Sequence, residues 1–277
     1  MTSLRMTPAR LATLAIGVPL VLILIGWTGF DAVALDARGS FPVSYVLPVQ
    51  DGQLVANLSG GDVTLRPGQG TTARLTGTVQ YDLVRPHVTE SSTAAGTRLG
   101  VGCRVPVGSC GLNATLQVPP QTGITLSSGG GDLRVSGPAA SVNLSSEGGD
   151  IAISGVGDLA RVSTGGGDLS ANDLAGIGQF STSGGDISGD DLTAPSVNAD
   201  SGGGDVALVF TKAPTNLDIT SGGGDIAIVL PQGDTAYNVT SSAGGGDDSV
   251  SVPVSPSSTN TIHVDSGGGD ITIAEAS

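Results

Sequence analysis

This chain of 277 residues has few of the side chains on which most binding and catalytic sites depend. Aromatic residues make up 3% of it, and its one tryptophan, Trp27, lies in an apolar run, so a stacking platform for carbohydrate has no support. The two cysteines alone supply too few ligands for a metal site, and the only histidines are His87 and His263. These two histidines lie far apart in the sequence, and we expect them to be surface or hydrogen-bonded residues without a catalytic role.

Motifs that carry catalysis or nucleotide binding are also missing. There is no G-x-S-x-G nucleophile elbow and no P-loop. Residues 155–160 match the dinucleotide pattern G-x-G-x-x-A, but the Arg-Val-Ser-Thr-Gly that follows predicts a strand and a turn instead of the required helix. We therefore expect no enzyme activity, no catalytic, cofactor-binding or metal-binding residues, and no small-molecule substrate.

Basic residues are scarce and unevenly placed. The chain has 11 Lys and Arg against 25 Asp and Glu, a formal net charge of −14. Residues 31–129 carry six acids and six arginines, whereas residues 130–277 carry nineteen acids and three basic residues, a net charge of −16. Such a surface repels phosphate backbones, so no nucleic-acid partner is expected, and it attracts cations or basic proteins.

Glycine is abundant, with 45 residues, and much of it lies in a repeat that ends in Gly-Gly-Asp. From the second copy onward the steps between aspartates are 18, 18, 18, 19, 20, 22 and 23 residues. A fixed period near 20 is typical of repeat proteins in which each unit stacks on the previous one. The nine aspartates are Asp62, Asp132, Asp150, Asp168, Asp186, Asp205, Asp225, Asp247 and Asp270.

Apolar residues keep a constant register around these aspartates, at positions −8, −6, +1 and +3 relative to the Asp. Around Asp150 they are Val142, Leu144, Ile151 and Ile153. Spacing by two predicts one buried face of a strand on each side of a glycine turn. Single units cannot bury this face, but stacked units share one narrow core.

The register predicts an all-β, single-stranded β-solenoid (β-helix-like) of about 18–23-residue Gly-Gly-Asp repeats. A third inward position falls at +6, in Val156, Leu174 and Leu192. Gly178 and Gly189 replace apolar residues, which predicts a looser coil around Asp186, and the inserted stretch 241–246 predicts another before Asp247. A meander of antiparallel hairpins and a flexible Gly/Ser linker are the alternatives. The last coil, after Ile273, is expected to leave an exposed edge.

The segment 11–30 is an uncharged apolar run long enough to span a bilayer as a helix. Arg5 and Arg10 precede it, which places the N-terminus in the cytoplasm and the repeats outside. The alternative is a cleaved signal peptide, because Ala32-Val33-Ala34 fits a cleavage site. In an exported chain, Cys103 and Cys110 are expected to form one local disulfide.

These features divide the chain into five segments. Residues 1–10 form a basic leader, 11–30 a membrane helix, 31–50 a juxtamembrane linker, 51–120 a first β-rich section with the disulfide loop, and 121–277 the solenoid array.

The leader, the mixed β section and the Leu-Gln-Val-Pro-Pro stretch (116–120) lead directly into SSGGGDLRVSG and SSEGGDIAISG. Together they resemble a large bacterial family of exported β-strand-repeat proteins that carries the name "putative adhesin" and a domain of unknown function. The resemblance covers about residues 40–277. It implies the solenoid fold and an envelope location, and it assigns no catalytic or binding residue.

The stacked aspartates permit two interpretations. Carboxylates about 4.8 Å apart repel one another unless corner amides or cations offset the charge. The repeat lacks half of the glycine-aspartate corners of calcium-binding nonapeptide arrays, which favours amide capping. We expect a membrane-anchored surface module that binds an envelope protein, adhesin-like or as a scaffold. The alternatives are a self-assembling stalk and a calcium-binding acidic surface.

Overall fold

The computed structural model describes residues 38–49, 51–58, 60–82, 85–93, 96–102 and 110–276. Every regular element in them is a β-strand, as predicted. None of the described residues belongs to a helix long and apolar enough to cross a membrane. The membrane helix predicted for residues 11–30 lies outside this part of the chain.

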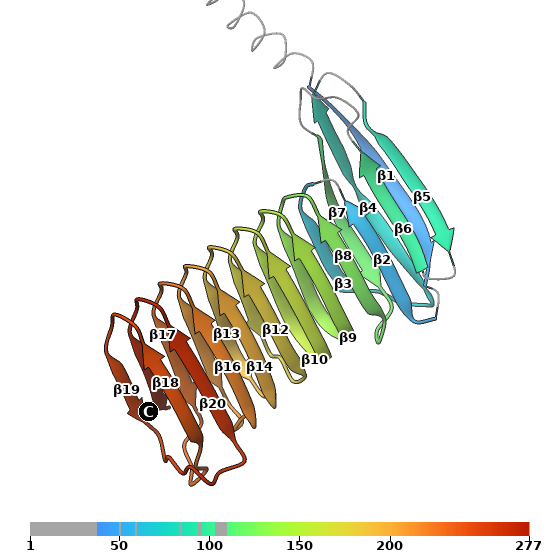
Figure 1. Cartoon of the computed structure of the whole chain (residues 1–277). Coiled ribbons are helices and arrows are strands. Elements are labelled where there is room, and N and C mark those ends of the chain that lie inside the picture. Colours follow the sequence, from blue (N-terminus) through green and yellow to red (C-terminus); the bar gives the residue numbers. More distant parts are fainter. Residues whose placement is uncertain are drawn as a thin grey trace, which may run out of the picture.

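The N-terminal end is an antiparallel sheet in which β4 pairs with both β1 and β7, with the hairpin β5–β6 beside it (Figure 1). The segment 38–48, expected within a linker, is instead strand β1, and it buries Val43 and Leu47. The five strands are β1 (Arg38–Pro48), β4 (Thr72–Asp82), β5 (His87–Thr93), β6 (Gly96–Gly102) and β7 (Cys110–Val118).

The remaining strands are parallel to one another and form the coils of a solenoid, which extends away from the antiparallel end (Figure 1). They are β2 (Gln53–Leu58), β3 (Val63–Pro67), β8 (Gly123–Ser128), β9 (Leu133–Ser146), β10 (Ile151–Thr164), β11 (Leu169–Asn172), β12 (Ile177–Thr182), β13 (Ile187–Leu192), β14 (Ser196–Ser201), β15 (Val206–Phe210), β16 (Asn216–Ser221), β17 (Ile226–Leu230), β18 (Asn238–Ala243), β19 (Asp248–Ser251), β20 (Thr261–Ser266) and β21 (Ile271–Glu275).

Each coil contributes one strand before its Gly-Gly-Asp corner and one after it. The strands before the corner form the first sheet: β2, β8, the later halves of β9 and β10, β12, β14, β16, β20 and β18. The strands after the corner form the second sheet: β3, the earlier halves of β9 and β10, β11, β13, β15, β17, β21 and β19. The parallel pairing rules out the antiparallel meander.

The core lies between the two sheets, and the predicted register places its side chains correctly. In the coil of Asp150, Val142, Leu144, Ile151 and Ile153 are all buried. The third inward row is also confirmed, because Val156, Leu174 and Leu192 are at most 1% exposed. The Asp62 coil shares this core, since β2 pairs with β8 and β3 with β9.

The coil around Asp186 is not loose, contrary to the sequence-based expectation. A Cβ atom at Gly178 would lie 2.8 Å from the Phe180 ring and 3.0 Å from a Leu174 methyl group. At Gly189 it would lie 2.9 Å from methyl groups of Leu192 and Leu208. Larger neighbours therefore fill the space that each glycine leaves, which preserves close packing.

The exposed end of the solenoid is not the last coil of the sequence, and that prediction was wrong. Strand β20 pairs with β16 on one side and β18 on the other, and β21 lies in the same way between β17 and β19. Strands β18 and β19 thus lie one coil further out than their place in the sequence suggests. The later strands β20 and β21 lie between them and the preceding coil, β16 and β17. The outermost coil is Asn238–Ser251, next to the C-terminal end in Figure 1.

A polar pair closes the core at this outermost coil. Its −6 and +1 positions hold Ser241 and Asp248, where the neighbouring coil buries Val264 and Ile271 completely. The Ser241 hydroxyl donates a hydrogen bond of 2.6 Å to Oδ2 of Asp248, and this bond joins the two sheets across the end of the core. A polar end is what a solenoid needs to present to water, although Val250 of the same coil is 37% exposed.

Candidate functional site

The corner aspartates form a continuous hydrogen-bonded row, here called the aspartate ladder. From Asp132 onward, the backbone N–H of each Asp donates to Oδ1 of the Asp in the adjacent coil, while the N–H of Asp62 donates to Oδ1 of Asn113. The distance is 2.9 Å from Asp168 to Asp150 and from Asp186 to Asp168. The ladder runs in spatial order through Asp62, Asp132, Asp150, Asp168, Asp186, Asp205, Asp225, Asp270 and Asp247, with N–H···Oδ1 distances of 2.8–3.2 Å.

Each ladder aspartate also holds its neighbour through the main chain. The carbonyl of Asp150 accepts from the N–H of Leu133 at 2.9 Å, and that of Asp168 accepts from Ile151 at 2.9 Å. The N–H···Oδ1 bonds of the ladder confirm the amide capping of the carboxylates that the sequence predicted. Because the amide comes from the adjacent coil, the carboxylate fixes the stacking of coils in addition to the shape of one turn.

A second row of buried hydroxyl groups, at position −4, supports the same corners. The Thr164 hydroxyl donates to the Gly149 carbonyl of the previous coil at 2.9 Å and accepts from the Gly167 N–H at 3.3 Å. This row was not predicted from the sequence. The signal was present, because every corner from Asp132 onward has Ser or Thr at −4 except Asp247, which has Ala243. The row consists of Ser128, Ser146, Thr164, Thr182, Ser201, Ser221 and Ser266, all at most 5% exposed.

The glycine directly before each aspartate is required by the closeness of the coils. A Cβ atom at Gly167 would meet the Gly149 carbonyl oxygen at 2.3 Å, a distance that real side chains do not tolerate. The glycine one position earlier is different, since a Cβ at Gly166 would have no atom within 4 Å. Only one of these two glycines is therefore a steric necessity of the ladder.

The ladder amides donate to Oδ1 and not to the second carboxylate oxygen, Oδ2. At one position a cation occupies it: Nη2 of Arg134 lies 3.3 Å from Oδ2 of Asp132. Arg134 stands at the outward +2 position of β9, so a positive group above the second sheet can reach the outer oxygens. Among the described residues, no group of three or more His, Cys, Asp or Glu side chains is arranged to hold a metal ion.

The outer face of the first sheet is polar and internally hydrogen-bonded. The Arg161 Nε–H donates to Oε1 of Gln179 at 2.8 Å, and the Thr261 hydroxyl donates to Oδ1 of Asn216 at 2.8 Å. Asn198 donates in the same way to Asp218. These bonds join adjacent coils, so this face supports the stack and presents a fixed array of amides and hydroxyls.

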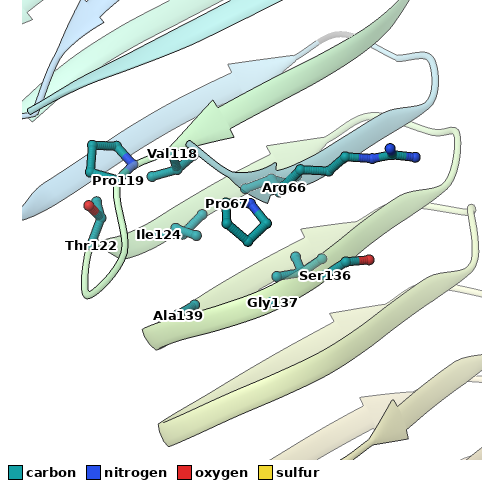
Figure 2. Close-up of a pocket in the computed structure, with 11 residues that line it drawn as sticks. Arg66, Pro67, Val118, Pro119, Thr122, Ile124, Ser136, Gly137 and Ala139 are labelled. Carbon is teal, nitrogen blue, oxygen red and sulfur yellow. The ribbon is translucent and has the colours of Figure 1, made fainter. Parts of the chain in front are cut away.

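Two hollows in the described part of the chain are either too small for a ligand or open to solvent. Figure 2 shows a small one where β3 ends at Pro67 and β9 bends at Gly137, with the Arg66 side chain extending away from it. Its volume of about 20 Å³ holds about one water molecule. A wider hollow of about 560 Å³ lies at the antiparallel end, lined by Arg38, Tyr81, Asp82 and Cys110 among others. It is open to solvent and polar.

The residues considered individually in the sequence do not assemble into a site. His87 on β5 and His263 on β20 are exposed and lie at opposite ends of the molecule (Figure 1). Residues 155–160 lie inside strand β10, and no helix follows them. Cys110 begins β7. Its predicted partner Cys103 lies outside the described residues, so the disulfide between them stays a prediction.

Solved structures that match this chain share little of its sequence. A putative adhesin from Parabacteroides merdae is 11% identical, with a TM-score of 0.48, over 87% of this chain and 96% of its own. One from Parabacteroides distasonis is 13% identical, with a TM-score of 0.47, over 85% and 97%. One from Bacteroides fragilis is 16% identical, with a TM-score of 0.45, over 86% and 97%.

The comparison with curated proteins gives no match. The comparison with family models gives one that covers most of the described residues. The model described as Toastrack DUF4097 matches residues 47–274, from the antiparallel end to the last strand of the solenoid. This is the family that the repeated Gly-Gly-Asp corners and the preceding mixed β section had suggested. The chain belongs to the Toastrack DUF4097 family.

Proposed function

We propose that this chain is a non-enzymatic binding module of the cell envelope, whose acidic solenoid contacts a protein partner. The observation that carries the proposal is the aspartate ladder. It holds a row of carboxylates at a fixed spacing, uses one oxygen of each for coil stacking, and leaves the other to the surface. With a net charge of −16 over residues 130–277, this surface favours a basic partner and strengthens the encounter with it.

Residues 11–30 are proposed to anchor the module as a membrane helix, with residues 38–277 on the extracytoplasmic side. The test is fractionation of the producing cells. The chain should stay with the membranes through a high-salt wash, and protease added outside intact cells should digest the solenoid. A mature N-terminus at Leu35 would instead establish cleavage of the apolar segment, and an intact solenoid after protease treatment would contradict the outward orientation.

The binding role is tested by cross-linking in intact cells. A photoreactive amino acid replaces Ser170 on the outer face of the second sheet or Gln179 on that of the first. The expected result is an adduct with one distinct envelope protein, at a lower yield when ladder aspartates are changed to Asn. Absence of any adduct from both faces would refute a binding role.

Self-association is the second candidate function, because the outermost strands β18 and β19 have unpaired outer edges among the described strands. The polar pair of Ser241 and Asp248 opposes end-to-end stacking, since a second copy would have to bury it. Adducts between two copies of this chain, in place of a distinct partner, would favour the stalk. A calcium-binding surface is less compatible with the ladder, because Oδ1 of each bonded carboxylate already accepts an amide.

A further inference from the structure

Two neighbouring strands of the second sheet, β15 and β17, are apolar on both faces, and the next strand, β21, adds one outward alanine beside Thr272. On β15, Val206, Leu208 and Phe210 point into the core, while Ala207 and Val209 point outward. Strand β17 repeats this arrangement with outward Ala227 and Val229, and β21 presents Ala274. Strands with two apolar faces are typical of sheets that are covered on both sides.

These outward residues form one contiguous surface, here called the outer apolar patch: Ala207, Val209, Ala227, Val229 and Ala274. The strand register aligns Ala207 with Ala227, and Val209 with Val229 and then Ala274. Adjacent strands are about 4.8 Å apart, so the side chains contact one another along the row.

The patch has polar borders. The outward residues are Ser188 and Asp190 on β13 at one side, and Ser249 and Ser251 on β19 at the other. An apolar patch rimmed by polar residues is a typical mark of a protein interaction surface.

The aspartate ladder runs along one margin of the patch. Asp205 and Asp225 each precede an outward alanine by two residues, and Asp270 stands in the same relation to Thr272. In the Asp132 coil that +2 position is Arg134, which pairs with Oδ2 of the aspartate at 3.3 Å. No side chain of the described residues forms an ion pair with Asp205, Asp225 or Asp270. A partner can therefore supply the cations that Arg134 supplies elsewhere.

We propose that the outer apolar patch binds a segment of a partner protein. Apolar side chains of this segment contact Val209 and Val229, and its Lys or Arg side chains lie along Asp205, Asp225 and Asp270. This inference rests on the proposed binding function and names its surface and the chemistry of its partner. The patch is small for a stable interface, so the contact is weak to moderate and salt-sensitive.

A second copy of this chain fits the patch poorly, because residues 130–277 of both copies carry a net charge of −16 and repel each other. The basic residues on the outer face of its second sheet are Arg66 and Arg134, and their outward neighbours are the polar Thr64 and Ser136. An anionic lipid surface is repelled by the same aspartates. Charge complementarity thus favours a basic protein segment over either of these occupants.

The test uses the purified full-length chain and a synthetic amphipathic helical peptide with a leucine stripe flanked on one side by lysines. Fluorescence anisotropy should detect binding that weakens as salt is raised. Two control peptides, one with the lysines changed to Glu and one with the leucines changed to Gln, should not bind. Absence of binding by the lysine-flanked peptide, or equal binding of all three, would overturn the proposal.

Matched variants locate the contact. Val209→Thr with Val229→Thr should weaken peptide binding about tenfold, because two buried methyl groups are replaced by hydroxyls. Ile177→Thr, an exposed site on the first sheet, should leave it unchanged. Asp205→Asn with Asp225→Asn keeps the ladder acceptors and should weaken binding about fivefold at low salt. The matched control, Asp150→Asn with Asp168→Asn, removes the same amount of charge from a part of the ladder outside the patch. Its loss of peptide affinity should be less than about half of the loss in the Asp205→Asn, Asp225→Asn variant.

Two outcomes would contradict this location. Equal losses in both aspartate pairs would mean that general acidity binds the peptide and the patch does not. Concentration-dependent dimers that disappear in the Val209→Thr, Val229→Thr variant would mean that a second copy occupies the patch. If peptide binding fails while cells still give a distinct cross-linked envelope protein, the proposed function stands and only this surface is wrong.

Discussion

The backbone N–H of Asp168 donates a 2.9 Å hydrogen bond to Oδ1 of Asp150, eighteen residues earlier in the chain. The same bond is repeated from coil to coil, so the acidic side chain that gives the repeat its sequence signature is also part of the lattice that sets the coil spacing. In a carboxylate held in this way, Oδ1 accepts the hydrogen bond that stabilises the stack of coils, and Oδ2 stays available to other groups at the surface.

Asn should replace a ladder aspartate with little loss of stability, and Ala should not. Asp168→Asn keeps an acceptor for the Asp186 N–H and relieves repulsion from neighbouring carboxylates, so we expect a change within about 1 kcal/mol. Asp168→Ala removes the acceptor and should cost about 1 kcal/mol or more. Urea unfolding of the two variants measures the difference, and an equal loss for both would show that the negative charge matters more than the acceptor.

Calcium should change the thermal stability of the full-length chain very little. Oδ1 of each bonded carboxylate accepts an amide, so cations are not needed to hold the row together. We expect the melting temperatures in millimolar calcium and in chelator to differ by less than about 2 °C. A larger rise that follows the logarithm of the calcium concentration would indicate specific binding and contradict this account.

The two glycines before Asp168 should respond differently to alanine. Gly167→Ala drives a methyl group against the Gly149 carbonyl oxygen, and it should cost about 3 kcal/mol or more. Gly166→Ala points into open space and should be tolerated, or even stabilise the chain by restricting its unfolded state. Thermal unfolding of both variants is the measurement, and similar losses would mean that the turn needs flexibility at both positions.

The buried hydroxyl row should depend on its hydrogen bonds and not only on its volume. Thr164→Val keeps the shape of the side chain but leaves the Gly149 carbonyl and the Gly167 N–H without their partner, at a cost of about 1–3 kcal/mol. Thr164→Ser keeps the hydroxyl, as in Ser146 and Ser201, and should cost less. A stable Val variant together with an unstable Ser variant would show that packing of the methyl group dominates.

The constant apolar register around each aspartate was enough to predict the solenoid and most of its core, because inward positions in a stacked array repeat with the chain. Two features needed the structure. The return of β20 and β21 between earlier coils depends on pairing between strands that are distant in sequence, although Ala243 and Asp248 mark the outermost coil as atypical. The outer apolar patch was visible as Ile-Ala-Ile-Val-Leu at 226–230, but only the register shows that its members lie side by side.

Tyr237 offers a test of packing beneath the outermost coil. The residue is 2% exposed, and its hydroxyl has no hydrogen-bond partner among the described residues. A buried hydroxyl without a partner is unfavourable, so Tyr237→Phe should leave stability at neutral pH unchanged or raise it by about 1 kcal/mol. A clear loss would show that the hydroxyl forms a stabilising contact with water.

The same residue should make stability sensitive to alkaline pH. Burial, and secondarily the charge of Glu275, raise the pKa of Tyr237 above its ordinary value of 10.0. The neutral form of Tyr237 therefore contributes to the free energy of unfolding. This contribution is fully present below pH 10, where the tyrosine is neutral in both the folded and the unfolded chain. It is lost as the pH rises from 10 toward the folded-state pKa, because the unfolded chain releases its proton first. The urea midpoint of unfolding should therefore decrease more between pH 8 and a pH above 10 in the parent chain than in Tyr237→Phe.

The control is Tyr45→Phe, a substitution at a partly exposed position on β1, which should show the same alkaline decrease in the urea midpoint as the parent chain. An identical decline in the parent and in Tyr237→Phe would mean that Tyr237 does not stay neutral in the folded state.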